Sequence, residues 1–105
     1  MVSFADQAAA ANEKKIYGPF NVKLGTNIRV TMKPVGTAAG DPDLYLKFDG
    51  AADLADFDCR PYSSGADEEC EGDVPAGVSA VGVMVHGYSA AKYSLPATYT
   101  EPTGP

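Results

Sequence analysis

Apolar and polar residues alternate along most of this chain with the period of two that is typical of β-strands. The pattern is clearest at residues 28–33, where Ile, Val and Met alternate with Arg, Thr and Lys. It recurs, less regularly, at residues 15–22, 44–48, 57–62, 68–72, 79–85 and 92–99. Turn-forming Gly, Pro, Asn and Asp separate the runs. Seven to eight short strands with almost no helix predict an all-β, antiparallel β-sandwich, with a β-barrel as the alternative.

One segment, residues 3–12, has a helical pattern instead. Ser3 is a favourable N-cap, Asp6 stands three residues later, and a run of alanines follows. Ten residues are a marginal length for a helix, so an extended segment is the alternative. We therefore expect a lead-in at residues 1–13, a sandwich at 14–100 and a linker or tail at 101–105.

Length, composition and charge narrow the class of protein. A chain of 105 residues fits one domain, and 45% apolar residues argue against disorder. No apolar run approaches the roughly 18 residues of a membrane span. The net charge of −6 argues against nucleic acid as a partner. All but two of the 14 acidic residues follow Gly40, and the densest group lies at residues 53–73. This group is expected to be a solvated rim that protects an edge hairpin, or else a site for cations or a basic partner.

Cys59 and Cys70 are the two cysteines, and they stand at hairpin spacing. The even number and the polar residues around both favour a local disulfide, which predicts an exported, secreted protein. The alternative is a pair of reduced thiols in a cytosolic protein. Two cysteines and one distant histidine, His86, match neither the spacing nor the ligand count of a structural zinc site.

An acidic turn carries the candidate metal site. Asp41 and Asp43 flank Pro42, a spacing that lets two hard oxygen ligands converge on a calcium ion. Calcium takes six to eight oxygens, so further donors would have to join them; the candidates are Asp6, Asn12, Glu13 and Asp49. The alternative is that both aspartates accept turn hydrogen bonds from backbone amides.

Six tyrosines are many for a chain of this length. The alternation places Tyr45, Tyr62 and Tyr88 on outer faces or turns, where their rings would suit a polymeric ligand such as a polysaccharide or a fibrous protein. Packing at the corners of the sandwich is the alternative. The other three tyrosines are assigned to packing: Tyr17, Tyr93 and Tyr99.

Nothing in the sequence predicts an enzyme. His86 is the one histidine, and the serines near it in sequence, Ser79, Ser89 and Ser94, show no nucleophile-elbow pattern. An exposed histidine at a strand end is the expected structure.

Several short motifs, in a fixed order, resemble the bacterial pre-peptidase C-terminal domain. They are GDPDLYL at 40–46, DCRPY at 58–62, EC at 69–70, PAG at 75–77, VMVHGYS at 83–89 and YSL at 93–95. The resemblance runs from about Lys14 to Tyr99. It departs from the family at His86, where arginine is more frequent.

The resemblance implies a jelly-roll-like β-sandwich carried by secreted bacterial proteases and other exported hydrolases. Similar domains of clostridial collagenases bind collagen and calcium, with ligands from the lead-in segment. Two functions follow as expectations. The first is a non-catalytic accessory domain beside a parent catalytic domain, binding a polymeric substrate such as collagen or polysaccharide, with calcium as a stabilising ion. The second is a secretion, processing and stability module with no ligand of its own.

Overall fold

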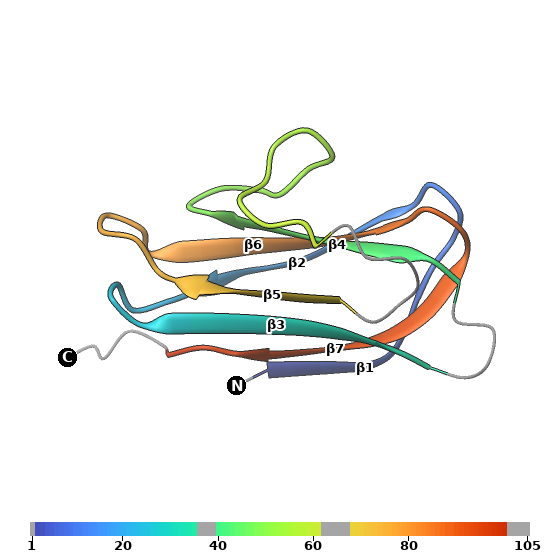
Figure 1. Ribbon diagram of the computed structural model, residues 1–105, viewed down its shortest axis with the longest axis horizontal. Helices are drawn as coiled ribbons and strands as arrows, with labels where there is room; N and C mark the ends of the chain where they lie inside the picture. The colour runs from blue at the N-terminus through green and yellow to red at the C-terminus, as the bar shows by residue number, and fades with distance from the viewer. Residues whose placement is uncertain (1, 36–39, 62–67, 101–105) are drawn as a thin grey trace.

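The computed structural model describes residues 2–35, 40–61 and 68–100 of the chain. Within them, strands form two antiparallel sheets packed face to face (Figure 1). In chain order they are β1 (Val2–Ala9), β2 (Lys14–Asn21), β3 (Asn27–Pro34), β4 (Pro42–Phe48), β5 (Glu68–Asp73), β6 (Ala80–Gly87) and β7 (Ala91–Thr98). The all-β sandwich expected from the alternation is confirmed.

The order of the strands is that of a jelly roll. One sheet has the order β1-β7-β3-β5 and the other β2-β6-β4, so that every connection crosses from one sheet to the other. This order puts β1 and β2 at the sheet edges on one side of the sandwich. It puts β4 and β5 at the edges on the opposite side. The two sides are closed by different chemistry.

The core follows the alternation along the strands. Inward positions are buried, and the outward positions of β3 carry exposed Arg29 and Lys33. Burying the inward side chains supplies most of the free energy of folding, at about 25 cal/mol per Å² of apolar surface. The buried positions at the centre are Ile28, Val30 and Met32 of β3, Leu44 and Leu46 of β4, Val81, Val83 and Val85 of β6, and Tyr93, Leu95 and Ala97 of β7.

Of the two structures expected at residues 3–12, the helix is wrong and the extended segment is correct, because most of this segment lies in β1. β1 lies beside β7, with Phe4 opposite Leu95 and Gln7 opposite Tyr93. A register shift lies between them, around Asp6, whose φ is 53°. Pairing with the edge of a sheet outweighs the weak helix propensity of a short alanine run. The sandwich thus includes residues ahead of the expected start at residue 14.

The hairpin expected between residues 57–62 and 68–72 is also wrong. β5 pairs with β3, where Arg29 bonds to both Glu69 and Glu71 at 2.8 Å. Residues 57–61 form no regular strand; Cys59 makes a single bridge to Leu46 of β4. Cross-strand charge pairs to β3 stabilise this partnership. Tyr62 and the residues that join the two expected strands, 63–67, lie outside the described residues.

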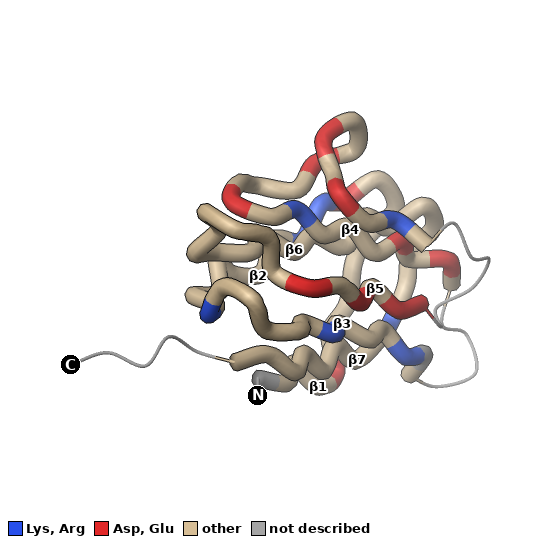
Figure 2. Tube along the Cα trace, turned by 60° about the vertical axis from the view of Figure 1, so that its left-hand side comes forward, with Lys and Arg blue, Asp and Glu red and all other residues tan. Residues whose placement is uncertain are grey.

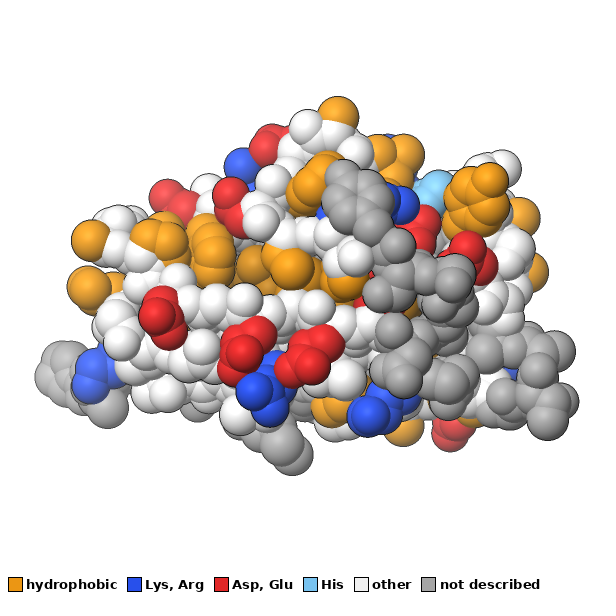
Figure 3. Space-filling model, in the orientation of Figure 1, with side chains coloured by type: hydrophobic (Ala, Val, Ile, Leu, Met, Phe, Trp, Pro, Cys, Tyr) orange, Lys and Arg blue, Asp and Glu red, His pale blue; other side chains and the backbone are white. Residues whose placement is uncertain are grey.

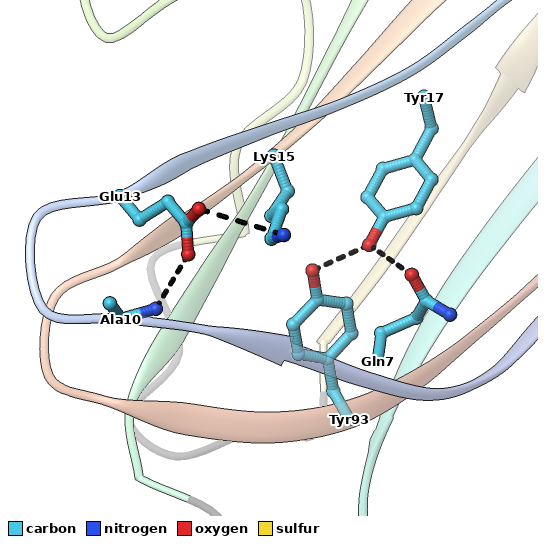
Figure 4. Close-up of polar contacts among 6 residues, drawn as sticks. All are labelled: Gln7, Ala10, Glu13, Lys15, Tyr17 and Tyr93. Carbon is cyan, nitrogen blue, oxygen red and sulfur yellow. Dashed lines mark hydrogen bonds and ion pairs between the residues drawn. The ribbon is translucent and has the colours of Figure 1, made fainter.

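Hydrogen-bonded hydroxyls close the β1/β2 side (Figure 4). The Tyr17 hydroxyl donates to Oε1 of Gln7 at 3.0 Å and lies 2.6 Å from the Tyr93 hydroxyl. Each hydroxyl has one proton, so Tyr93 donates to Tyr17. Phe4 packs against the Tyr17 ring with centroids 4.8 Å apart. Burial raises the pKa of Tyr17 and, more strongly, that of Tyr93, so this closure is uncharged.

The turn between β1 and β2 is tied down beside this network. Glu13 accepts a hydrogen bond from the amide of Ala10 at 2.8 Å and pairs with Lys15 at 3.5 Å (Figure 4). The backbone bond lowers the pKa of the Glu13 carboxyl. Glu13 therefore stabilises its own turn.

Candidate functional site

The acidic turn before β4 is held in place by the turn between β6 and β7. Gly40 has φ of 73°, and an added Cβ there would collide with the carbonyl oxygen of Ala90, so the position requires glycine. The amide of Asp41 donates to Oγ of Ser89 at 2.9 Å, and Pro42 pairs with Gly87. These contacts fix the direction in which Asp41 and Asp43 leave the strand.

Glu68, the first residue of β5, reaches across to β4. Its side chain is buried, with 2% of the residue exposed. Oε1 accepts a hydrogen bond from the amide of Leu44 at 2.8 Å, but Oε2 has no hydrogen-bond partner among the residues that the structure describes. Burial raises the pKa of the Glu68 carboxyl to about 7, and the negative charges of Asp43 and Asp41 add to the effect. A buried oxygen without a partner is costly, so it marks a position that a ligand would satisfy.

The carboxylates of Asp41, Asp43 and Glu68 converge, with one oxygen from each within 4.8 Å of the others. The sequence pointed to the two aspartates but missed Glu68. A usable signal was present, because Glu68 and Cys70 are two apart on a strand and therefore point to the same, inward face. Among the described residues, none of the other proposed carboxylate donors, Asp6, Glu13 and Asp49, belongs to this group. The fourth proposed donor, Asn12, lies in the turn before β2, where its backbone amide donates to the carbonyl of Gly87.

Arg60 supplies a positive charge beside the three carboxylates. Its guanidinium donates to Asp43 at 3.2 Å and, through Nε, to the Tyr45 hydroxyl at 2.8 Å. The guanidinium carbon also lies 5.2 Å from the centre of the Tyr45 ring. Asp43 therefore faces a cationic side chain, where the alternative expectation for Asp43 was a bond to a backbone amide.

The donor set fits a hard divalent cation. Calcium binds oxygen at roughly 2.3–2.6 Å, so two ligands of one ion are at most about 5 Å apart, and the carboxylate oxygens meet this condition. The unpartnered Oε2 of Glu68 supports the fit. Arg60 neutralises part of the charge, and water would complete the coordination.

The predicted disulfide is confirmed and flanks this group. Cys59 and Cys70 are bonded, with Cα atoms 6.0 Å apart. Because Cys59 lies against β4 and Cys70 lies in β5, the bond joins the two sheets. Arg60 adjoins one cysteine and Glu68 stands two residues before the other. The covalent bond thus fixes both segments that carry the charged side chains.

The expected exposure of the tyrosines is confirmed for Tyr88 and wrong for Tyr45. Tyr88 is 71% exposed, on the turn after β6. Tyr45 is buried, because the loop after β4 folds over the outer face of the sheet and covers it with Ala52 and Phe57. The Phe57 ring meets the Tyr45 ring edge-on at 5.4 Å. Tyr62 lies outside the described residues.

The tyrosines assigned to packing behave as expected. Tyr17 and Tyr93 are buried, and Tyr99 packs against the core beside Phe20, with centroids 5.6 Å apart. His86 lies near the end of β6, as expected, but is partly buried where an exposed side chain was expected. These residues therefore add no group to the site.

Acidic residues line the outer edge of the sandwich (Figures 2 and 3). They gather along β5, where Glu69 and Glu71 flank Arg29 of the neighbouring strand. In the loop after β4, Asp53 pairs with Lys14 at 2.8 Å and Asp56 with Lys47 at 2.7 Å. The hydrogen bond from Lys14 contributes most to the lowered pKa of Asp53. Much of this acidity is thus balanced by basic side chains at the surface, on the edge strand β5 and in the loop after β4.

Comparison with known proteins gives one family match. Residues 17–83 match the model of the family described as "Bacterial pre-peptidase C-terminal domain". No solved structure matches the chain. Within the part of the chain that the structure describes, no helix is long and apolar enough to cross a membrane.

Several curated relatives are proteases. The chain is 36% identical over 70 residues to a virulence metalloprotease of Vibrio anguillarum, a match covering 67% of this chain and 11% of the relative. It is 41% identical over 61 residues to xanthomonalisin of a Xanthomonas species, covering 57% and 7%. It is 42% identical over 71 residues to alkaline serine exoprotease A of Vibrio alginolyticus, covering 67% and 13%. The matched part of the chain thus spans about a tenth of each relative.

Proposed function

Since the chain belongs to the bacterial pre-peptidase C-terminal domain family, we propose that it is a non-catalytic accessory domain of a secreted bacterial protease. The relatives include a metalloprotease and a serine exoprotease, so the shared segment accompanies different catalytic chemistries. A disulfide between the two sheets supports an exported protein, because such bonds persist in oxidising compartments.

The role that the geometry favours is that of a stability and processing module. The observation that carries it is the closure of the β4/β5 side by a disulfide next to three converging carboxylates. Of the tyrosines proposed to bind a polymer, Tyr45 is buried and serves to hold Arg60. This side of the sandwich is thus organised around its own internal contacts.

In this proposal calcium is a structural ion held by Asp41, Asp43 and Glu68. Its chemistry would be to neutralise three carboxylates that otherwise repel one another. The residues prepare for it: Gly40 and Ser89 direct Asp41, and the amide of Leu44 directs the Glu68 carboxylate so that Oε2 is left open. Arg60 balances Asp43 when no other cation is near.

Calorimetric titration of calcium into the 105-residue chain at pH 8 tests the ion site. We expect one site that Glu68→Gln weakens at least about tenfold, because a neutral amide replaces a buried charged ligand. The matched control is Glu69→Gln, the neighbouring position on the opposite face of β5, which should bind as the parent does. Equal binding by all three proteins would contradict the ion site but leave the accessory role standing.

A second candidate function is binding to a polymeric substrate or surface, and the exposure of Tyr88 favours it. Tyr88 precedes Ser89, which bonds to Asp41, so an exposed ring stands close to the carboxylate group. Sedimentation with insoluble collagen, chitin and cellulose, with calcium and with chelator, tests this function. We expect Tyr88→Ala to reduce the fraction of the chain that sediments with a polymer. The control is Leu24→Ala, a change at another exposed apolar residue, which should leave this fraction unchanged. A chain that stays in the supernatant with every polymer would contradict the candidate.

A further inference from the structure

An apolar cleft of about 350 Å³ lies on the outer face of the three-stranded sheet, and neither the proposed function nor the ion site uses it. One wall is β2, at residues 16–19, and the other is the start of the loop after β4, at residues 49–52. The floor is β6, at Ala80, Gly82 and Val83. Figure 1 shows this loop rising from the face of the sheet that points away from the other sheet.

The loop wall is firmly built. The amide of Asp49 donates to the carbonyl of Ala80 at 2.7 Å. Gly82 lets the loop approach, because a Cβ there would collide with the carbonyl oxygen of Gly50. Farther along the loop, Lys47 pairs with Asp56 at 2.7 Å. The cleft therefore exists before any ligand arrives, which reduces the entropy cost of binding.

The two ends of the cleft differ in charge. At one end Lys14 of β2 pairs with Asp53 of the loop at 2.8 Å, so both charges are satisfied. At the other end is Asp49, beside Ala80, which pairs with Asn21 at the far end of β2. Asp49 is exposed, and within the described residues its carboxylate makes no hydrogen bond or ion pair. An open carboxylate thus stands at the mouth of an apolar cleft.

The wall on β2 exposes a large apolar side chain. Ile16 lines the cleft, and 62% of this residue is exposed to solvent. An aliphatic ligand would cover it and gain about 25 cal/mol for each Å² removed from water. The volume is near the lower limit of ligand pockets, so it suits one or two side chains.

We propose that this cleft binds a peptide segment in which an aliphatic side chain stands next to a lysine or arginine. The aliphatic group fills the space between Ile16 and Ala52, and the cation pairs with Asp49. The net charge of −6 on the chain favours the approach of a basic segment over an acidic one. The site does not depend on the calcium proposal, because it lies on residues outside that group.

Amide chemical-shift mapping with blocked dipeptides tests the proposal. The probes are N-acetyl-leucyl-lysinamide, N-acetyl-leucyl-glutamamide carrying a free side-chain carboxylate, and N-acetyl-glycyl-lysinamide. We expect the first to shift the amides of Gly50, Ala52 and Gly82, with an affinity on the order of millimolar. The acidic probe should bind at least about threefold more weakly. The glycyl probe, which lacks the aliphatic group, should bind about tenfold more weakly or worse.

Two matched pairs of variants locate the contacts. Asp49→Asn should remove the preference for lysine over glutamate, whereas Asp6→Asn should keep it; both aspartates are exposed and have φ near 55° (57° and 53°), which asparagine tolerates. Ile16→Ala should weaken the leucyl probes, whereas Leu24→Ala, at a residue that is 59% exposed, should not.

Three results would overturn the proposal. The shifts could map away from the cleft, or the acidic probe could bind as well as the basic one. The same amides could also shift on concentrating the chain without peptide, which would make a second copy of the chain the occupant.

Discussion

The two sides of this sandwich at which sheet edges meet, β1/β2 and β4/β5, are closed by different chemistry. On the β1/β2 side, a neutral chain of hydrogen bonds runs from Tyr93 through Tyr17 to Gln7. On the β4/β5 side, a disulfide stands beside Glu68, Asp43 and Arg60, all buried or nearly so. The first closure needs only the folded chain. The second needs an oxidising compartment, and its buried charges gain from a bound cation.

The difference between the two sides indicates where oxidation and calcium would act on this domain. A chain exported to an oxidising compartment gains its disulfide there, and calcium is available outside cells in the concentrations that weak sites require. Both would act on the β4/β5 side and leave the β1/β2 side unchanged. The stability of the β4/β5 side would thus depend on whether the domain has been exported.

The largest expected effect is that of removing the disulfide. The double change Cys59→Ala, Cys70→Ala opens a loop with a sequence separation of 11 and should cost about 3 kcal/mol on the chain-entropy model. That corresponds to a drop of roughly 10–20 °C in Tm, measured by circular dichroism. A loss of less than about 1 kcal/mol would show that the covalent bond is not what closes this side.

The next effect is the pH dependence contributed by Glu68. Its folded pKa is raised from 4.5 to about 7, so its contribution to stability is full below pH 4.5 and is lost as pH rises through about 7. In chelator, Glu68→Gln should therefore gain about 2 kcal/mol relative to the parent between pH 5 and pH 8, after allowance for solvent screening. Urea unfolding at both pH values measures this. A difference independent of pH would contradict the raised pKa.

On the β1/β2 side, Tyr17→Phe should cost about 1–2 kcal/mol at any pH from 5 to 8. The change removes the acceptor for Tyr93 and the donor to Gln7, leaving buried polar atoms without partners. Tyr93→Phe should cost less, because Tyr17 keeps its bond to Gln7. Urea denaturation of both variants checks the order, and the reverse order would contradict the direction of donation. The stability effects of the tyrosine variants should not change between pH 5 and pH 8, because both tyrosine pKa values are raised from about 10. The effect of Glu68→Gln should change over this range, so pH distinguishes the two sides.

The smallest effect concerns the surface. Arg29→Ala removes the ion pairs to Glu69 and Glu71, which are exposed. Exposed pairs contribute little, so the change should alter stability by less than about 1 kcal/mol and less still in 0.5 M salt. Equilibrium unfolding at two salt concentrations tests this. A larger loss would mean that these pairs decide which strand β5 joins.

Much of the fold could be predicted from the alternation of residues. The strands centred on Val30, Leu46 and Val83 were expected, with the correct residues inward, because one buried face imposes a period of two. For residues 3–12 the sequence left a helix and an extended segment open, because an alanine run carries no strand pattern. Its structure is decided by β7, whose paired residues are 82 to 95 positions away in sequence and which supplies the edge that β1 completes.

The site could be predicted only in part. The acidic turn at Asp41 and Asp43 was legible in sequence, and so was the disulfide. Glu68 could be expected to face inward, as Cys70 does two residues later. Its meeting with Asp41 and Asp43 could not be expected, because it depends on β5 pairing with β3 and turning its first side chain toward β4. Tyr45 was placed on the correct face, but a loop that covers this face leaves no periodic signal. Contacts between segments far apart in sequence, such as a loop that packs over a sheet face, leave no periodic pattern in the sequence.

The most direct test of the account is the Tm of the oxidised and the reduced chain, each with calcium and with chelator. We predict that reduction lowers Tm most, that calcium raises Tm of the oxidised chain, and that this increase shrinks after reduction because Arg60 and Glu68 lose their covalent anchor. Equal Tm values for the oxidised and the reduced chain, with no change on adding calcium to either, would contradict the account.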